Sequence, residues 1–263
     1  MRLDVTELLN FYETPLGACA LRAIVERVNG LWGNLSGLDV LGVGYAAPYL
    51  QSLEGEPRRL VSLMPASQGG HAWTPTDRGS ASVVAAEREL PFPDAVFDRI
   101  LIVHALEETG NYTRFLREIW RVAAPEAHIL VVVPNRSGAW SLSDNTPFGH
   151  GRPFSRRQTK RLLRDALIEP SAWTRALYTP PVDWKMFTSA SEGWERVGEL
   201  FLPNIGGVNL VEGVKRVRID PSTPSKVRVV APANMRPAMI TKKQLREQSA
   251  YVTHLTQRKE TTP

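Results

Sequence analysis

The chain has 263 residues, of which 43% are hydrophobic and 22% charged, with a formal net charge of +5. This length and apolar fraction are typical of one large globular domain and argue against a chain too polar to fold. The single cysteine, Cys19, excludes a disulfide framework and a cysteine-rich metal site, and favours a reducing, cytoplasmic compartment.

Most of the net charge lies near the C-terminal end. Residues 235–263 hold six basic and two acidic side chains, which account for four of the five net positive charges. The remainder is nearly neutral, so the high isoelectric point does not imply a basic nucleic-acid face on the folded part. No apolar run approaches the roughly 18 residues of a membrane span, and the N-terminus lacks the pattern of a signal peptide.

Two helices are predicted at the N-terminus. Asp4 and Glu7 have the spacing of a capping box, which predicts a helix over residues 4–13. Thr14 is a suitable N-cap for a second helix with apolar positions at helical period. The pair Asn29-Gly30 is expected to end it in the left-handed conformation.

Short apolar runs then alternate with helical patterns. A helix is predicted over 109–122, between the fourth and fifth of these runs. This alternation favours an α/β fold with a mostly parallel sheet and helices on both faces. The five predicted strands are 38–43, 60–64, 82–85, 96–103 and 128–133.

The last third of the predicted domain completes the sheet. Ser155 and Gln158 form a second capping box, for a helix that ends near residue 167. The stretches 173–178 and 208–219, continued by 226–230, are β-like. Beyond Ala231 apolar periodicity is lost, which predicts a flexible basic tail. The expected parts are N-terminal helices 1–34, an α/β domain 35–230 and a tail 231–263.

Residues 38–48, LDVLGVGYAAP, resemble the first motif of class I S-adenosylmethionine (SAM)-dependent methyltransferases. In that family a strand ends in a glycine-containing turn. A turn without bulky side chains lets backbone amides approach the amino-acid end of SAM at the carboxyl end of the first strand. A Gly-x-Gly alone is not specific, so the resemblance depends on the segments that follow.

Those segments resemble the type 11 subgroup of the same family, in the same order. They are ELPFPDAVFD at 89–98, IVHALE at 102–107, FLREIWRV at 115–122, APEA at 124–127 and HGRPFS at 150–155. Further likeness, to a bacterial subset of methyltransferase-domain proteins, lies in FYETPLG at 11–17 and GGVNLVEGVKR at 206–216. The resemblance implies a Rossmann-like, doubly wound, seven-stranded, mostly parallel sheet that binds SAM.

The resemblance places the candidate cofactor contacts at the ends of the first, second and fourth strands. They are Gly42, Gly44, Tyr45 and Ala46 around the methionine end, Met64 and Pro65 against the adenosine, Glu87 near the adenine, and His104 and Ala105 beside the site of methyl transfer.

Three polar anchors of the family have no counterpart here. Gly42 stands where the first motif has an acid, and the second strand ends in Met64-Pro65 without the acid that binds the ribose. Ala86 stands where an aspartate approaches the adenine, with Glu87 as a substitute. A carboxylate–hydroxyl hydrogen bond contributes about 1.5–3 kcal/mol, so the missing ribose anchor alone lowers SAM affinity by about tenfold or more.

Two functions follow. The first is a SAM-dependent methyltransferase with an unidentified small-molecule or macromolecular acceptor, in which catalysis comes mainly from positioning. The second, motivated by the missing acids, is a catalytically inactive binding or assembly module that has lost SAM and works with a protein partner.

Two histidines are candidates for a general base. Histidine is the side chain that most often acts as a general base, so His104 and His150 are the candidates, each with a structural role as its alternative. Phe11 and Tyr12 form part of a lid over the site or are ordinary core contacts. No Gly-x-Ser-x-Gly elbow, Cys/His pair or metal-ligand spacing is present, so no nucleophile scheme or metal is expected.

A strongly basic helix is predicted over residues 156–164. The helical spacing places Arg157, Lys160, Arg161 and Arg164 on one face. This is a solvated face, or a docking surface for an acidic substrate, a protein partner or RNA. The last option supports an RNA-directed methyltransferase as a third hypothesis.

Overall fold

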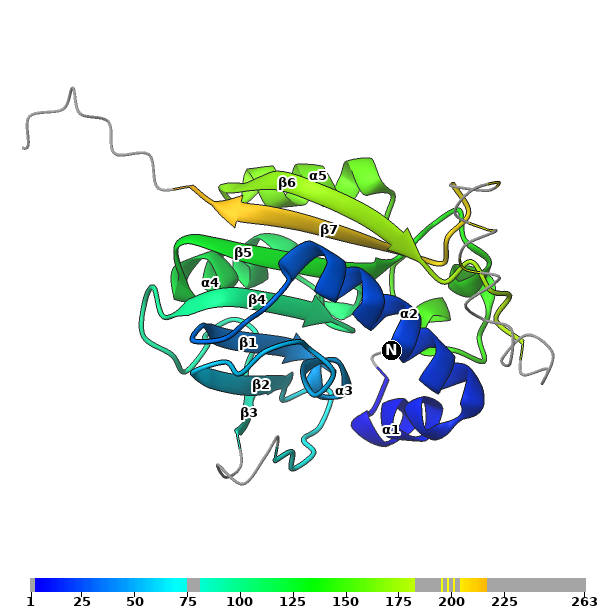
Figure 1. The fold of residues 1–263 in the computed structure, drawn as a ribbon, viewed down its shortest axis with the longest axis horizontal. Helices are drawn as coiled ribbons and strands as arrows, with labels where there is room; N and C mark the ends of the chain where they lie inside the picture. Colours follow the sequence, from blue (N-terminus) through cyan, green and yellow to red (C-terminus); the bar gives the residue numbers. More distant parts are fainter. Residues whose placement is uncertain are drawn as a thin grey trace, which may run out of the picture. The chain divides into compact units, whose positions relative to one another are not determined.

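A seven-stranded sheet is the centre of the structure, a computed structural model that describes residues 3–74, 81–182, 195, 198, 201 and 204–216. The order is β3-β2-β1-β4-β5-β7-β6 (Figure 1). The bounds are β1 Asp39–Gly44, β2 Arg59–Pro65, β3 Ser82–Ala85, β4 Phe97–Val103, β5 Ala123–Pro134, β6 Ile168–Ala176 and β7 Val208–Lys215. The predicted fold class is confirmed.

Strand direction changes only near one edge. The pairs from β3 to β5 are all parallel, while β7 is antiparallel to both β5 and β6. All five central strands expected from the sequence are present. The two C-terminal stretches pair as β6 and β7, although β6 begins five residues before its predicted start. Residues 226–230 and the tail lie outside the described residues.

The helices and short 3-10 turns connect these strands. Their bounds are α1 Val5–Glu13, α2 Pro15–Trp32, α3 Ala47–Leu50, α4 Tyr112–Val122 and α5 Arg156–Asp165, with 3-10 turns at Leu106–Glu108, Ala139–Leu142 and Pro147–Gly149. No helix in the described part of the chain is long and apolar enough to cross a membrane.

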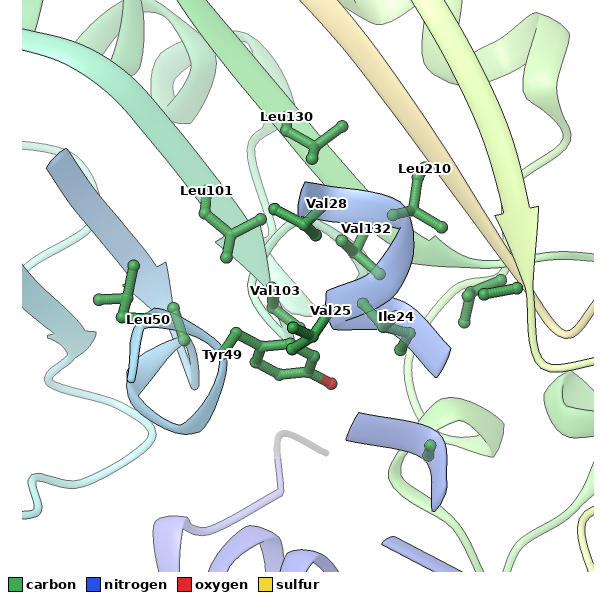
Figure 2. Packing of buried hydrophobic residues seen from close by; sticks show 14 of the residues in the cluster. Ile24, Val25, Val28, Tyr49, Leu50, Leu101, Val103, Leu130, Val132 and Leu210 are labelled. Carbon is green, nitrogen blue, oxygen red and sulfur yellow. The ribbon is translucent and has the colours of Figure 1, made fainter. Parts of the chain in front are cut away.

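Alternate residues of each strand point to opposite faces, so the sheet is covered on both. On one face α2 lies across the middle strands, with Val25 and Val28 among the side chains of Leu101, Leu130 and Val132 (Figure 2). On the other face α4 and α5 bury the side chains Phe115, Leu116, Ile119 and Leu163. Near-continuous burial along β1 and β4 explains why their sequences are apolar runs rather than alternating patterns.

The two predicted capping boxes are confirmed. Asp4 accepts from Thr6 while Glu7 accepts from the amide of Asp4, and Ser155 and Gln158 pair in the same way before α5. The predicted end of α2 at Asn29-Gly30 is wrong. The helix continues to Trp32 and ends at Gly33, whose φ is +61°. Packing of Val28 and Trp32 in the core outweighs the helix-breaking tendency of Gly30.

This longer helix gives a prediction about Gly30. A Cβ at Gly30 meets no atom within 4 Å, and its φ is not in the left-handed region. Replacing Gly30 by Ala is therefore expected to raise the free energy of unfolding by about 0.5–1 kcal/mol, since glycine is costly inside a helix. Urea denaturation measures this change. A decrease in stability would show that the backbone at residue 30 is not helical in solution.

Helix α3 was not predicted. Its packing explains why residue 42 is a glycine and not the acid of the family's first motif. A Cβ on Gly42 would lie 2.6 Å from Cβ of Ala46 and 2.7 Å from Cδ1 of Leu50. The side-chain direction of residue 42 is therefore filled by α3. An acidic side chain at this position has no room while α3 packs this closely on β1.

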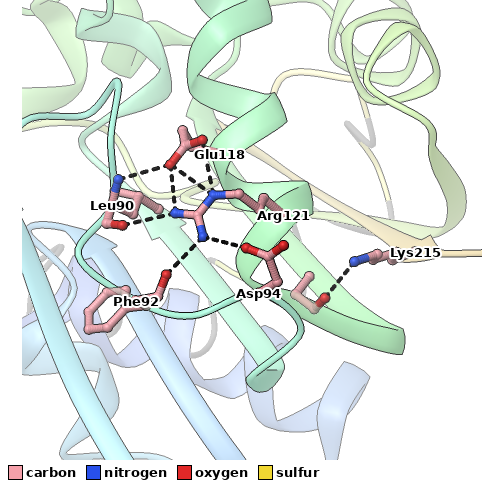
Figure 3. Close-up of polar contacts among 7 residues, drawn as sticks. Leu90, Phe92, Asp94, Glu118, Arg121 and Lys215 are labelled. Carbon is pink, nitrogen blue, oxygen red and sulfur yellow. Dashed lines mark hydrogen bonds and ion pairs between the residues drawn. The ribbon is translucent and has the colours of Figure 1, made fainter. Parts of the chain in front are cut away.

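Arg121 holds the loop before β4 against α4 (Figure 3). Its guanidinium donates to the carbonyls of Leu90 and Phe92 and to the carboxylates of Asp94 and Glu118. Glu118 also accepts from the amide of Leu90 at 2.9 Å. Residues 90–94, LPFPD, thus form a loop that is held against α4 by the hydrogen bonds of Arg121.

Candidate functional site

The carboxyl end of β1 makes a tight turn beside the end of β4. Gly44 has a φ of +88°, and a Cβ there would lie 2.0 Å from the carbonyl oxygen of Val103. The amide of Tyr45 donates to the same oxygen at 3.0 Å. Only glycine tolerates this φ together with this close approach. The turn lies where the connections from β1 and β4 lead to opposite sides of the sheet, the usual ligand site of an open α/β sheet.

His104 follows β4 directly, in a strained backbone conformation. Its φ is 51°, which costs a residue with a Cβ about 1–2 kcal/mol. Its carbonyl accepts from the side-chain amide of Gln68 at 3.2 Å, and its ring is buried. Strained residues persist where the surroundings hold them, and they cluster at functional sites.

A chain of polar groups passes through the His104 ring. Nε2 lies 2.7 Å from the hydroxyl of Tyr12, which also bonds to the hydroxyl of Tyr49, and Nδ1 lies 3.4 Å from Oε1 of Glu107. A carboxylate oxygen accepts hydrogen bonds, so Glu107 favours the ring tautomer that carries its proton on Nδ1. Nε2 then accepts from Tyr12, and Tyr12 accepts from Tyr49.

The phenols around His104 are held in their protonated form. Burial raises the pKa of Tyr45 to about 12, with a smaller contribution from Glu13. Burial, followed by the neighbouring Tyr49, raises the pKa of Tyr12 well above its ordinary range. These hydroxyls therefore stay protonated at physiological pH and act as hydrogen-bond donors.

Two buried oxygens of this cluster have no hydrogen-bond partner among the described residues. They are Oε2 of Glu107 and Oε1 of Gln68. Both are acceptors and both residues are at least 95% buried, so each unpaired oxygen carries a desolvation cost. The cluster therefore has spare capacity for a ligand that donates N–H or O–H groups.

Helix α1 covers this end of the sheet. Val5 and Leu8 pack with Tyr45 and Met64, and the amide of Val5 donates to the carbonyl of Gln68 at 2.9 Å. The ring of Tyr12 stacks on that of Tyr45 with centroids 5.4 Å apart. All of the candidate contacts at this end of the sheet are buried, namely Tyr45, Ala46, Met64, Pro65, His104 and Ala105.

The remaining candidates follow other strands of the sheet. Pro65 ends β2 opposite Ala85 of β3, and Glu87 is half-buried in the turn after β3. His150 bonds through Nε2 to the carbonyl of Asp144 at 3.0 Å. This bond does not involve the residues around His104. Among the described side chains, no group of three or more His, Cys, Asp or Glu is placed to hold a metal.

Sequence reasoning missed Glu107 and Gln68 as members of the site. Glu107 lies three residues after His104, a spacing that brings side chains together in a helical turn, and a 3-10 turn begins at Leu106. That spacing was the available signal. Gln68 had none, since its contact with residue 104 depends on the loop after β2.

Residues 38–131 match the model of the methyltransferase domain family. Ajmaline N-methyltransferase of Rauvolfia serpentina is 30% identical over 81 residues, which are 31% of this chain and 26% of that protein. The matched segment thus spans about a quarter of the length of this curated relative. The family match includes the Gly44 turn and ends within β5, before the C-terminal strands.

Solved structures support the fold over a longer stretch. A SAM-dependent methyltransferase of Thermotoga maritima superposes with a TM-score of 0.57 at 15% identity, over 81% of this chain and 96% of that one. One from Aquifex aeolicus has a TM-score of 0.51 at 16% identity, over 81% and 99%. Residues 38–131 thus carry the sequence match to the methyltransferase domain family, and the whole sheet has the fold of the solved SAM-dependent methyltransferases.

Proposed function

We propose that this protein binds SAM at the Gly44 turn and transfers its methyl group to an acceptor still to be identified. The observation that carries the proposal is the contact between Gly44 and Val103, which brings β1 and β4 together without side chains between them. That geometry lies within the segment that matches the methyltransferase domain family.

The residues of the cluster fit SAM, which supplies a methyl group on a positively charged sulfur together with a charged amino group. The two unpaired acceptors, on Glu107 and Gln68, suit a cationic N–H donor. Glu107 would compensate for the acid that α3 excludes from position 42. Met64 and Pro65 would supply apolar contact to the adenosine in place of a ribose-binding carboxylate, and Glu87 would lie toward the adenine.

His104 is the group best placed to take a proton from an acceptor. Its Nε2 lone pair points to the hydroxyl of Tyr12, and Glu107 holds the opposite nitrogen. An acceptor hydroxyl or amine that takes the place of the Tyr12 hydroxyl would meet the same lone pair. Glu107 would then stabilise the imidazolium that forms.

Helix α1 must move for the ligands to enter. Tyr12 occupies the position in front of His104, and Leu8 lies on Met64. In the closed arrangement α1 excludes water from the cluster, which strengthens the electrostatic contacts inside it. This proposal uses the aromatic lid predicted from Phe11 and Tyr12.

Calorimetric titration of SAM, and of S-adenosylhomocysteine, into the full chain tests the proposal. We expect a dissociation constant of about 10–100 μM, equivalent to about −5.5 to −7 kcal/mol. Replacing Glu107 by Gln keeps the shape and removes the charge, so SAM should bind about tenfold more weakly. Glu89→Gln makes the same change at an exposed position and should bind as the unaltered chain does.

Two results would contradict parts of this proposal. Equal SAM affinity in the Glu107→Gln and Glu89→Gln variants would remove Glu107 from the cofactor site. No heat at millimolar SAM would favour the alternative, an inactive methyltransferase-fold module that binds a protein partner.

A further inference from the structure

A row of cations on α5 continues onto the edge strand β6. Arg156, Lys160 and Arg164 are spaced by four residues, so they lie about 6 Å apart along one side of the helix. Across from them Trp173 and Arg175 belong to β6, which ends the sheet. These five residues are here called the cationic face. The prediction from sequence had grouped Arg157 rather than Arg156 with this row.

Aromatic stacking orders two of the cations. The guanidinium carbon of Arg156 lies 3.6 Å from the ring centroid of Trp173, and that of Arg175 lies 4.9 Å from it. Arg175 is also held by the side-chain amides of Asn209 and Asn204, at 3.1 and 3.2 Å. The guanidinium groups of Arg156 and Arg175 are therefore held in defined positions.

The row is electrostatically unfavourable for the isolated protein. Like charges four residues apart destabilise a helix, and cations in the first turn oppose the helix dipole. Burial, then Arg156 and Arg164, lower the pKa of Lys160, while burial and Arg175 lower that of Arg156. Within the described part of the chain the only ion pair of α5 is Arg161–Asp165, at 3.8 Å on the exposed side.

We infer that the cationic face binds single-stranded nucleic acid. A row of four cations, two of them ordered by contact with Trp173, suits a phosphate backbone. Unpaired bases stack on aromatic rings and on guanidinium planes such as the one over Trp173. A basic helix can also bind a membrane, but a helix that inserts into lipid needs an apolar side that is free. The apolar side of α5, with Leu163, is instead buried against the sheet.

Fluorescence anisotropy of a labelled 20-nucleotide single-stranded RNA with the full chain tests this inference. We expect micromolar affinity at 50 mM salt, and a logarithmic salt slope near −3, because the four cations of the cationic face contribute about −0.7 each on a single strand. Substituting Lys160→Glu with Arg164→Glu should weaken binding at least tenfold. Trp173→Leu keeps the net charge and should weaken binding about fivefold, because Arg156 and Arg175 lose the ring that orders them.

A control pair makes the same change of charge away from this surface. Arg22→Glu with Arg88→Glu, on α2 and in the turn after β3, should leave the affinity within twofold. The basic residues beyond 235 are identical in all these proteins. Absent binding at 50 μM protein would overturn the inference, as would equal losses in both charge-reversed pairs, or binding of phosphatidylserine vesicles but not of RNA. SAM is not part of the assay, so its result is independent of the proposed methyl transfer.

Discussion

Replacing Gly44 by Ala is expected to lower the free energy of unfolding by about 2–5 kcal/mol and to abolish SAM binding. The left-handed φ of +88° is disfavoured for alanine, and the new Cβ would lie 2.0 Å from the carbonyl oxygen of Val103. The clash can be relieved only if β1 and β4 separate at their carboxyl ends. Urea denaturation and calorimetric titration measure the two effects.

Gly110→Ala is the matched control for this change. A Cβ at Gly110 meets nothing within 4 Å, and its φ is not positive. The free energy of unfolding of the Gly110→Ala variant should stay within about 0.5 kcal/mol of that of the unaltered chain. A Gly44→Ala protein with unchanged stability and unchanged SAM affinity would show that the turn relaxes easily and is not the cofactor site.

Replacing Arg121 by Ala is expected to destabilise the protein by about 2–4 kcal/mol. The change leaves the carbonyls of Leu90 and Phe92 without their donor and removes the cation from Glu118, so that only the Leu90 amide still links the 90–94 loop to Glu118. Arg117→Ala removes an exposed arginine of the same helix and should change stability by less than about 0.5 kcal/mol. Equal effects of the two substitutions, in urea denaturation, would refute a structural role for the network.

The same network predicts a pH dependence. Hydrogen bonding to Arg121 holds the pKa of Glu118 below its ordinary value. A carboxyl group with a lowered folded-state pKa stabilises the protein above its unfolded-state pKa, and this contribution is lost as the pH falls through the folded-state pKa. In Arg121→Ala the acid limb of a stability–pH profile should therefore be shallower. A parallel profile would exclude Glu118 as a source of the acid sensitivity.

The sheet could be predicted from sequence because its signals are local. Short apolar runs, three of them followed by glycine or proline, predicted the five parallel strands, and the spacing of Asp4 and Glu7 predicted how α1 begins. The end of α2 could not be predicted, because it depends on the packing of Trp32 against distant residues. Helix α3 is only four residues long, too short to have a periodic pattern.

The site was predictable to a lesser extent, for a related reason. The turn at Gly44 could be predicted because the segments that follow Gly42-Val43-Gly44 resemble the same family in the same order. The absence of an acid at position 42 looked like a lost function, while the structure shows a packing constraint from Ala46 and Leu50. The pairing of His104 with Tyr12 joins residues 92 positions apart, which no local pattern records.

The closed position of α1 has a consequence for measured affinities. If SAM binds only when α1 is displaced, the apparent dissociation constant equals the intrinsic one divided by the fraction of molecules that are open. With about 1% open, a site of intrinsic micromolar affinity would be measured at about 100 μM. Substitutions that strengthen the capping box at Asp4 and Glu7 would then make the protein more stable and its cofactor affinity weaker. Selection for tight binding and selection for stability therefore act in opposite directions on residues 4–13.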